Sequence, residues 1–287
     1  MRVLFLSFLA LCIGAARAEA EPISIVAAEN FYGDVAAQIG GDLVAVSSIL
    51  SNPDQDPHLF EASASTARQL AAARLVVFNG ADYDPWMAKL LAGSPNRKRE
   101  TIEVAKLMHR KPGDNPHLWY DPETMPKFAE ALAAPLEARD PEHARAYARN
   151  LAAFNASLAP LKAKIAAMRA AHAGAPVTAT EPVFGYMATA LGLAMRNERF
   201  QLAIMNDTEP AASDIAAFQT DLTKRQVRVL IYNNQTSGTL AAKMQTLAKD
   251  AGVPVVGVSE TEPAGMKYQD WMLAQLNALD AALSAKP

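Results

Sequence analysis

The chain has 287 residues, of which 51% are hydrophobic, and its formal net charge is −3 at pH 7. Because this length exceeds the usual domain size of about 100 to 150 residues, we expect two domains, and the apolar content suffices for two cores. A nearly neutral charge without a long basic run excludes nucleic acid as the expected partner.

The N-terminal residues 1–20 have the features of a secretory signal peptide. Arg2 precedes an apolar run at 3–16, and small residues then allow cleavage after Ala18 or Ala20. The run is too short to cross a bilayer, which takes about 20 apolar residues, and no later segment approaches that length. We therefore expect an exported, soluble mature protein.

The only cysteine, Cys12, lies inside this signal segment. Leu11 stands directly before it, where a lipid-attachment site normally has a small residue, so lipid attachment is not expected. Once the signal is removed, neither a disulfide nor a thiolate metal site is available. Any metal site must then use histidine, aspartate or glutamate.

Short apolar segments alternate with helical segments in two parts of the chain. In the first part, 21–140, strands are predicted at 23–28, 43–50 and 75–79, with helices at 31–39 and 62–73. In the last part, 174–287, strands are predicted at 176–180, 227–232 and 254–258, with helices at 183–191, 213–223 and 239–251. This alternation is typical of α/β folds, so we predict two lobes, each a mostly parallel sheet flanked by helices.

Between the lobes, residues 141–173 are predicted to form one long, rigid linking helix. Pro141 opens it, Asp140 stands at the N-cap position, and Gly174 ends it. Apolar residues follow a 3,4 spacing at Ala144, Tyr147, Leu151, Phe154, Leu158, Leu161, Ile165 and Met168. One face is therefore buried, and packing on the protein's own lobes is favoured over a coiled-coil dimer, which makes a monomer the expected state. Pro160 removes one backbone hydrogen bond and is expected to bend the helix.

Two loops of the first lobe present a histidine directly after a proline. These are Asp56-Pro57-His58 and Asn115-Pro116-His117. A stiff loop suits a metal ligand, because the imidazole nitrogen must lie about 2.0 to 2.1 Å from the ion. Asp56 and Asp121 are close enough in sequence to accept the other ring N–H of these histidines. The residues alone fit equally well two turn histidines bonded to loop carbonyls. The remaining histidines are expected at the surface: His109, His143 and His172.

The second lobe has no histidine after His172, so its ligands would be carboxylates. Glu181 and Glu260 each follow a predicted parallel strand, which places them at one edge of the sheet, facing the first lobe. Glu262 is the fallback for Glu260. Solvated glutamates at strand ends remain the alternative interpretation.

At these residues the chain resembles the metal-binding solute-binding proteins of bacterial zinc and manganese ABC importers, a family of two α/β lobes joined by one long helix. The resemblance covers the mature chain and is carried by Asp56-Pro57-His58 with Glu61, by Asn115 to Trp119 with Asp121-Pro122, and by the segments 181–186 and 258–261. It implies that His58, His117, Glu181 and Glu260 hold one divalent transition-metal ion in the periplasm, and that a membrane permease receives it.

Two departures from the family pattern stand out. The acidic, histidine-rich loop of many zinc-binding members is missing, since residues 97–115 contain a single histidine, His109. Glu260 stands where the family usually has an aspartate, which makes the side chain one methylene longer. The fourth ligand is therefore assigned to Glu260, with Glu262 kept open.

The ion itself is open between zinc, manganese and iron. Two imidazoles and two carboxylates are borderline or hard donors, which excludes copper(I) as the preferred ion. The carboxylates favour manganese or iron, whereas the Irving–Williams order favours zinc.

A secreted zinc-dependent hydrolase is the alternative function, because two histidines and a glutamate around zinc also form catalytic sites. Against it, the chain has no His-Glu-x-x-His pair and no Gly-x-Ser-x-Gly elbow, and it offers a fourth protein ligand.

Histidine ligation makes metal affinity depend on pH. An imidazole must be neutral to bind a cation, and histidine has an ordinary pKa of about 6.5. We therefore expect the dissociation constant, measured by calorimetry, to rise as the pH falls from about 7.5 to about 5. Unchanged affinity over this range would contradict histidine ligation.

Overall fold

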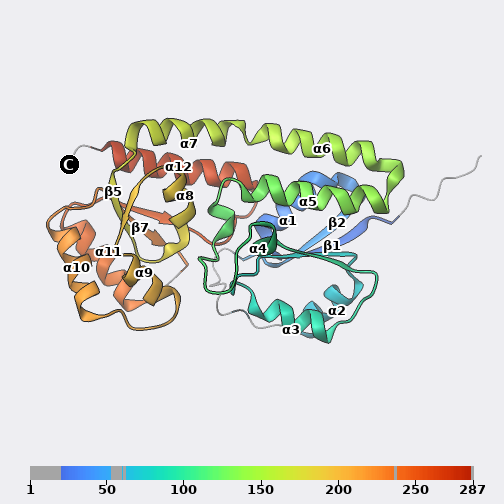
Figure 1. Ribbon diagram of the computed structural model, residues 1–287, viewed down its shortest axis with the longest axis horizontal. Coiled ribbons are helices and arrows are strands. Elements are labelled where there is room, and N and C mark those ends of the chain that lie inside the picture. The colour runs from blue at the N-terminus through green and yellow to red at the C-terminus, as the bar shows by residue number, and fades with distance from the viewer. Residues whose placement is uncertain (1–20, 53–59, 61–62, 236–237, 286–287) are drawn as a thin grey trace, which may run out of the picture.

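The computed structural model describes residues 21–52, 60, 63–235 and 238–285. The signal segment with Cys12, and two of the predicted site residues, Asp56 and His58, lie outside the described residues. Figure 1 shows two lobes side by side, spanned by a pair of helices that run along one side of both.

The first lobe is built on a parallel four-stranded sheet in the order β2-β1-β3-β4. Its strands are β1 (Ile23–Glu29), β2 (Val44–Leu50), β3 (Leu75–Phe78) and β4 (Glu100–Glu103). Its helices are α1 (Asn30–Gly40), α2 (Ala64–Ala72), α3 (Pro85–Gly93), α4 (Val104–Leu107) and α5 (Thr124–Arg139), with 3-10 turns η1 (Gly41–Leu43) and η3 (Leu118–Tyr120). The central strands β1 and β3 are mostly apolar, as expected for a parallel sheet that is covered on both faces.

The second lobe repeats this topology, with a parallel sheet in the order β6-β5-β7-β8. Its strands are β5 (Pro176–Ala179), β6 (Ala194–Arg196), β7 (Leu230–Asn233) and β8 (Val255–Val258). Its helices are α8 (Gly185–Ala190), α9 (Glu198–Met205), α10 (Ala212–Thr223), α11 (Thr239–Asp250) and α12 (Tyr268–Ser284), with a 3-10 turn η5 (Pro182–Phe184). The predicted fold class, two parallel α/β lobes, is confirmed.

The long helix between the lobes is present but interrupted. It consists of a 3-10 turn, η4 (Pro141–His143), followed by α6 (Ala144–Ser157) and α7 (Ala159–His172), with Leu158 between the last two. Pro160 is the second residue of α7, and because proline has no N–H it cannot donate a helical hydrogen bond to the preceding turn. Asp140 does not cap α6 but accepts hydrogen bonds from the His143 ring and the Tyr147 hydroxyl.

Each half of this helix packs on a different part of the protein. Helix α6 lies against α1 and α5 of the first lobe, whereas α7 lies against α12, which follows the last strand of the second lobe. The predicted apolar face is buried at Tyr147, Phe154, Leu158, Leu161 and Met168. Among the described residues, no helix is both long and apolar enough to cross a membrane.

The main hydrophobic core is continuous across the two lobes. Phe31 of α1 packs against Trp119, with ring centroids 4.5 Å apart, and against Trp271 of α12, at 6.1 Å. The Tyr268 hydroxyl of α12 donates a hydrogen bond to the Trp119 carbonyl at 2.7 Å. The lobes therefore share buried apolar surface, which fixes how their facing edges meet.

An ion pair between the linking helix and α12 makes stability depend on pH. Asp280 is 2.7 Å from both Lys164 and His172, and hydrogen bonds from these two residues lower the pKa of its carboxyl. A lowered folded-state pKa stabilises the protein above the ordinary value of about 3.9, and this contribution is lost as the pH falls through the folded value.

We expect Asp280→Asn to lower the melting temperature by about 1 to 3 °C at pH 7, because the charge pair is lost but is partly screened by solvent. The difference should be smaller at about pH 3, below the ordinary carboxyl pKa of about 3.9, when the melts are followed by circular dichroism. Glu130→Gln, at an exposed position on α5, serves as the control. An equal effect of Asp280→Asn at both pH values would contradict the ionic origin.

Candidate metal site

The carboxyl ends of the two sheets point toward the boundary between the lobes. In both sheets the strand order reverses at the first strand, between β1 and β3 and between β5 and β7, and such reversal points are where open α/β sheets place ligands. Glu29 ends β1 and Glu181 follows β5, while Asn233 ends β7 and Glu260 follows β8 by two residues. The topology thus gathers these polar side chains at one place.

His117 lies fully buried at this boundary, in edge contact with the rings of Tyr83 and Trp119. Its Nδ1 is 2.7 Å from the Asn115 side-chain oxygen. The Asn115 amide nitrogen donates instead to the Pro182 carbonyl, so its oxygen accepts and the His117 proton belongs on Nδ1. The lone pair is therefore on Nε2, which is 3.5 Å from the Glu260 carboxylate of the other lobe.

The residue that orients His117 differs from the one expected from sequence. Asp121 was expected beside the second ring nitrogen, but its carboxylate accepts the backbone N–H of Glu123 at the start of α5. Asn115 takes the position beside Nδ1 because the tight Asn115-Pro116-His117 turn brings its side chain back to the ring. A β-carbon at Gly185 would lie 2.9 Å from the Asn115 amide nitrogen, so this contact favours glycine there.

Glu181 and Glu260 are held together by one asparagine. The Asn233 amide nitrogen donates to Glu181 Oε2 at 3.2 Å and to Glu260 Oε1 at 2.5 Å. All three side chains are at most 5% exposed. Gln235, in the turn after β7, accepts the backbone N–H of Glu260 at 2.6 Å. Both carboxylates predicted as ligands are thus brought together, in a setting that fixes their orientation.

Tyr83 contributes to the site from the first lobe. Burial raises the pKa of its hydroxyl, and so do the charge of Glu260 and a hydrogen bond to it. The next residue, Asp84, accepts the backbone N–H groups of Asn79 and Gly80. The Asn79 amide in turn donates to the Pro116 carbonyl at 2.8 Å, directly before His117. This chain of contacts fixes the loop that carries His117.

Glu29 is a buried acid that the sequence reasoning missed. It lies beside Asp84, and burial, followed by the negative charge of Asp84, raises the pKa of its carboxyl well above the usual value. The sequence feature that could have identified it is a glutamate at the end of an otherwise mostly apolar strand. A raised pKa makes Glu29 easier to protonate, which would reduce the repulsion between its carboxyl and that of Asp84.

Glu262, the fallback ligand, lies against α1 of the first lobe. Its backbone N–H donates to the Asn30 side-chain oxygen, and its carbonyl accepts from the Asn30 amide. Burial, with a smaller contribution from Asp34, raises the pKa of its carboxyl to about 9. Its contacts belong to the lobe junction, whereas those of Glu260 belong to the cluster with His117.

The described part of the chain contains three of the four predicted ligands, His117, Glu181 and Glu260, in one connected polar cluster. In this part no three histidine, cysteine, aspartate or glutamate side chains stand close enough to enclose an ion. The fourth predicted ligand, His58, belongs to residues 53–59, which lie outside the described residues.

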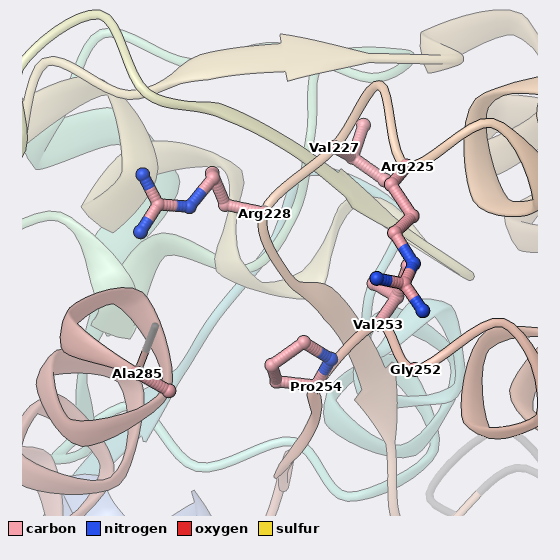
Figure 2. A pocket seen from close by; sticks show the side chains of 7 residues that line it. All are labelled: Arg225, Val227, Arg228, Gly252, Val253, Pro254 and Ala285. Carbon is pink, nitrogen blue, oxygen red and sulfur yellow. The ribbon is translucent and has the colours of Figure 1, made fainter. Parts of the chain in front are cut away.

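A pocket at the opposite edge of the second sheet has a different chemistry (Figure 2). Arg225 donates to the Ala251 carbonyl at 2.6 Å and Arg228 to the Leu283 carbonyl at 2.7 Å, so each caps the C-terminal end of a helix. The other lining residues are Val227, Gly252, Val253, Pro254 and Ala285. None of these side chains is a metal ligand or a general acid or base, and the pocket is explained by helix capping.

Comparisons with known proteins agree with this architecture. The chain is 27% identical to the zinc-binding lipoprotein AdcA of Streptococcus pneumoniae, over 84% of this chain and 52% of AdcA. It is 23% identical to the manganese ABC transporter substrate-binding lipoprotein PsaA of the same species, over 83% of this chain and 80% of PsaA. The structure of the periplasmic zinc binding protein TroA from Treponema pallidum superposes with a TM-score of 0.76 at 18% identity, covering 92% of this chain and 100% of TroA. Residues 25–282 match the model of the ZnuA family, described as zinc-uptake complex component A, periplasmic, and the chain therefore belongs to this family.

Proposed function

We propose that the protein captures one divalent transition-metal ion, zinc, manganese or iron, between its lobes and delivers it to the permease of an ABC-type importer. The observation that carries this proposal is the buried His117 Nε2, which faces the Glu260 carboxylate of the other lobe at 3.5 Å. His117 Nε2 faces the buried Glu260 carboxylate, which shares the Asn233 amide with Glu181. A cation at this place would offset the repulsion between the two carboxylates.

The proposed ligands are His58 and His117 from the first lobe and Glu181 and Glu260 from the second. Four protein ligands would close the coordination sphere and leave no position for a reactive water, as in structural rather than catalytic zinc sites. Membership of a family of metal-uptake components supports binding and transport over the hydrolase alternative.

The proposed location is the periplasm, after removal of residues 1–20. AdcA and PsaA are named lipoproteins, which makes lipid anchoring through Cys12 the alternative for this chain. Leu11 before Cys12 argues for the cleaved, unanchored form. The proposed partner is a membrane permease that receives the ion from a monomeric protein.

Metal content tests the function directly. We expect elemental analysis of the protein, purified without chelator, to find about one equivalent of zinc, manganese or iron. The double variant His58→Ala, Glu181→Ala should hold less than about a tenth of this, because it loses one ligand from each lobe.

The matched control removes a histidine and a glutamate from exposed positions. His109→Asn, Glu130→Ala should keep the full metal content, and asparagine tolerates the positive φ of 54° at His109. If the unaltered protein takes up none of the three ions, even when each is added in a calorimeter, the proposed function is wrong.

The choice between Glu260 and Glu262 gives a second test. We expect Glu260→Gln to weaken metal binding by about 100-fold or more, because it removes a charged ligand that faces His117. Glu262→Gln should leave affinity within about threefold, since its contacts are with α1. Chelator competition measures both constants, and the reverse order of effects would assign the ligand to Glu262.

A further inference from the structure

The Asn233 side chain donates hydrogen bonds to both Glu181 and Glu260. Its amide nitrogen has two hydrogens, and each carboxylate takes one of them through a single oxygen. The Asn233 oxygen accepts the backbone N–H of Gln235 at 3.0 Å, which assigns the nitrogen to the side of the carboxylates. The amide therefore engages Glu181 Oε2 and Glu260 Oε1.

We propose that Asn233 is a positioning residue that restricts each of the two carboxylates to one coordinating oxygen, and thereby biases the site toward zinc over manganese. This inference rests on the proposed function and deepens it, since it addresses which ion the same site prefers.

The geometry at Glu260 shows how the restriction works. Its Oε1 is drawn to Asn233, while Oε2 is the oxygen that lies 3.5 Å from His117 Nε2. An ion next to His117 therefore meets Oε2 first, and a two-oxygen contact would require Oε1 to leave the amide. The same reasoning at Glu181 assigns coordination to Oε1, because Oε2 is engaged by Asn233.

The number of donor atoms decides between ions. In the ligand set proposed above, one nitrogen from each of two histidines and one oxygen from each of two glutamates would make four donors, which is the tetrahedral number that zinc takes in protein sites. Manganese prefers more oxygen donors in octahedral sites, which two-oxygen carboxylate contacts would help to supply. A residue that prevents such contacts therefore disfavours manganese more than zinc.

Asn233 is itself held firmly enough to enforce this arrangement. Its side chain is 3% exposed, and it pairs with Val258 in the β7–β8 ladder. The residues after β8 are anchored to the turn after β7 as well. There the Gln235 side-chain oxygen accepts the backbone N–H groups of Glu260 and Thr261. Residues at the ends of the sheet strands thus orient the two carboxylates before an ion binds.

The first experiment measures zinc and manganese dissociation constants, by chelator competition, for the unaltered full-length mature protein, Asn233→Ala and Asn233→Ser. We expect the preference for zinc over manganese to fall by about fivefold or more in Asn233→Ala, which lacks both donors, and by less in Asn233→Ser, which keeps one. Asn150→Ala is the matched control, since Asn150 donates to the Ile39 carbonyl away from the site.

If Asn233 had a purely structural role, its replacement would weaken the binding of zinc and of manganese equally. A preference for zinc over manganese that changes by less than about fivefold in Asn233→Ala therefore overturns the inference. Should the variants fail to fold, X-ray absorption of the zinc-loaded unaltered protein decides: four nitrogen and oxygen neighbours with single-oxygen carboxylates support it, and a two-oxygen carboxylate overturns it. If the unaltered protein binds neither ion, the proposed function itself fails, which is a different result from binding without a changed preference.

Discussion

The site depends on two buried carboxylates of one lobe, Glu181 and Glu260, of which Glu260 faces the buried imidazole of His117 across the boundary between the lobes. Removing an ionised carboxylate from water costs roughly several kcal/mol even after the protein relaxes. Glu181 and Glu260 both lie in this boundary, and one amide donates to both. A divalent cation would offset this cost, and a ligand that binds only the folded state stabilises it in proportion to the logarithm of its concentration over Kd.

The fold supplies the stiffness that such a buried polar cluster requires. The aromatic side chains of Phe31, Trp119 and Trp271 join the lobes in a single core, and the halves of the interrupted long helix pack on α5 and on α12. Near the site, the Tyr120 hydroxyl donates to the Ser259 carbonyl across the boundary at 2.7 Å. These contacts hold the facing sheet edges in register, so that ligands from both lobes converge.

Local patterns in the sequence predicted the lobes, six strands and the buried face of the long helix. They missed β4 and β6, because these strands are short and carry exposed polar or charged residues. They placed Asp121 rather than Asn115 beside His117, because sequence distance does not show which side chain a turn folds back. The Glu29–Asp84 pair was invisible for the same reason, since its two residues are 55 positions apart on different elements.

In both halves of the chain, an asparagine at the end of an apolar run indicated a residue that supports the proposed ligands. Asn79 follows the third strand of the first sheet and Asn233 ends the third strand of the second, each after a run of apolar residues. Both are buried and donate from the amide nitrogen, but to different targets: Asn79 to the Pro116 carbonyl, and Asn233 to the two glutamates.

The difference follows from what each ligand type requires. An imidazole offers one lone pair, so fixing the backbone and ring of His117 is enough to aim it. A carboxylate offers two oxygens, so a second group must decide which of them meets the ion. Equivalent positions in the repeated topology therefore carry the same residue type for two separate tasks, aiming a histidine loop in one lobe and selecting carboxylate oxygens in the other.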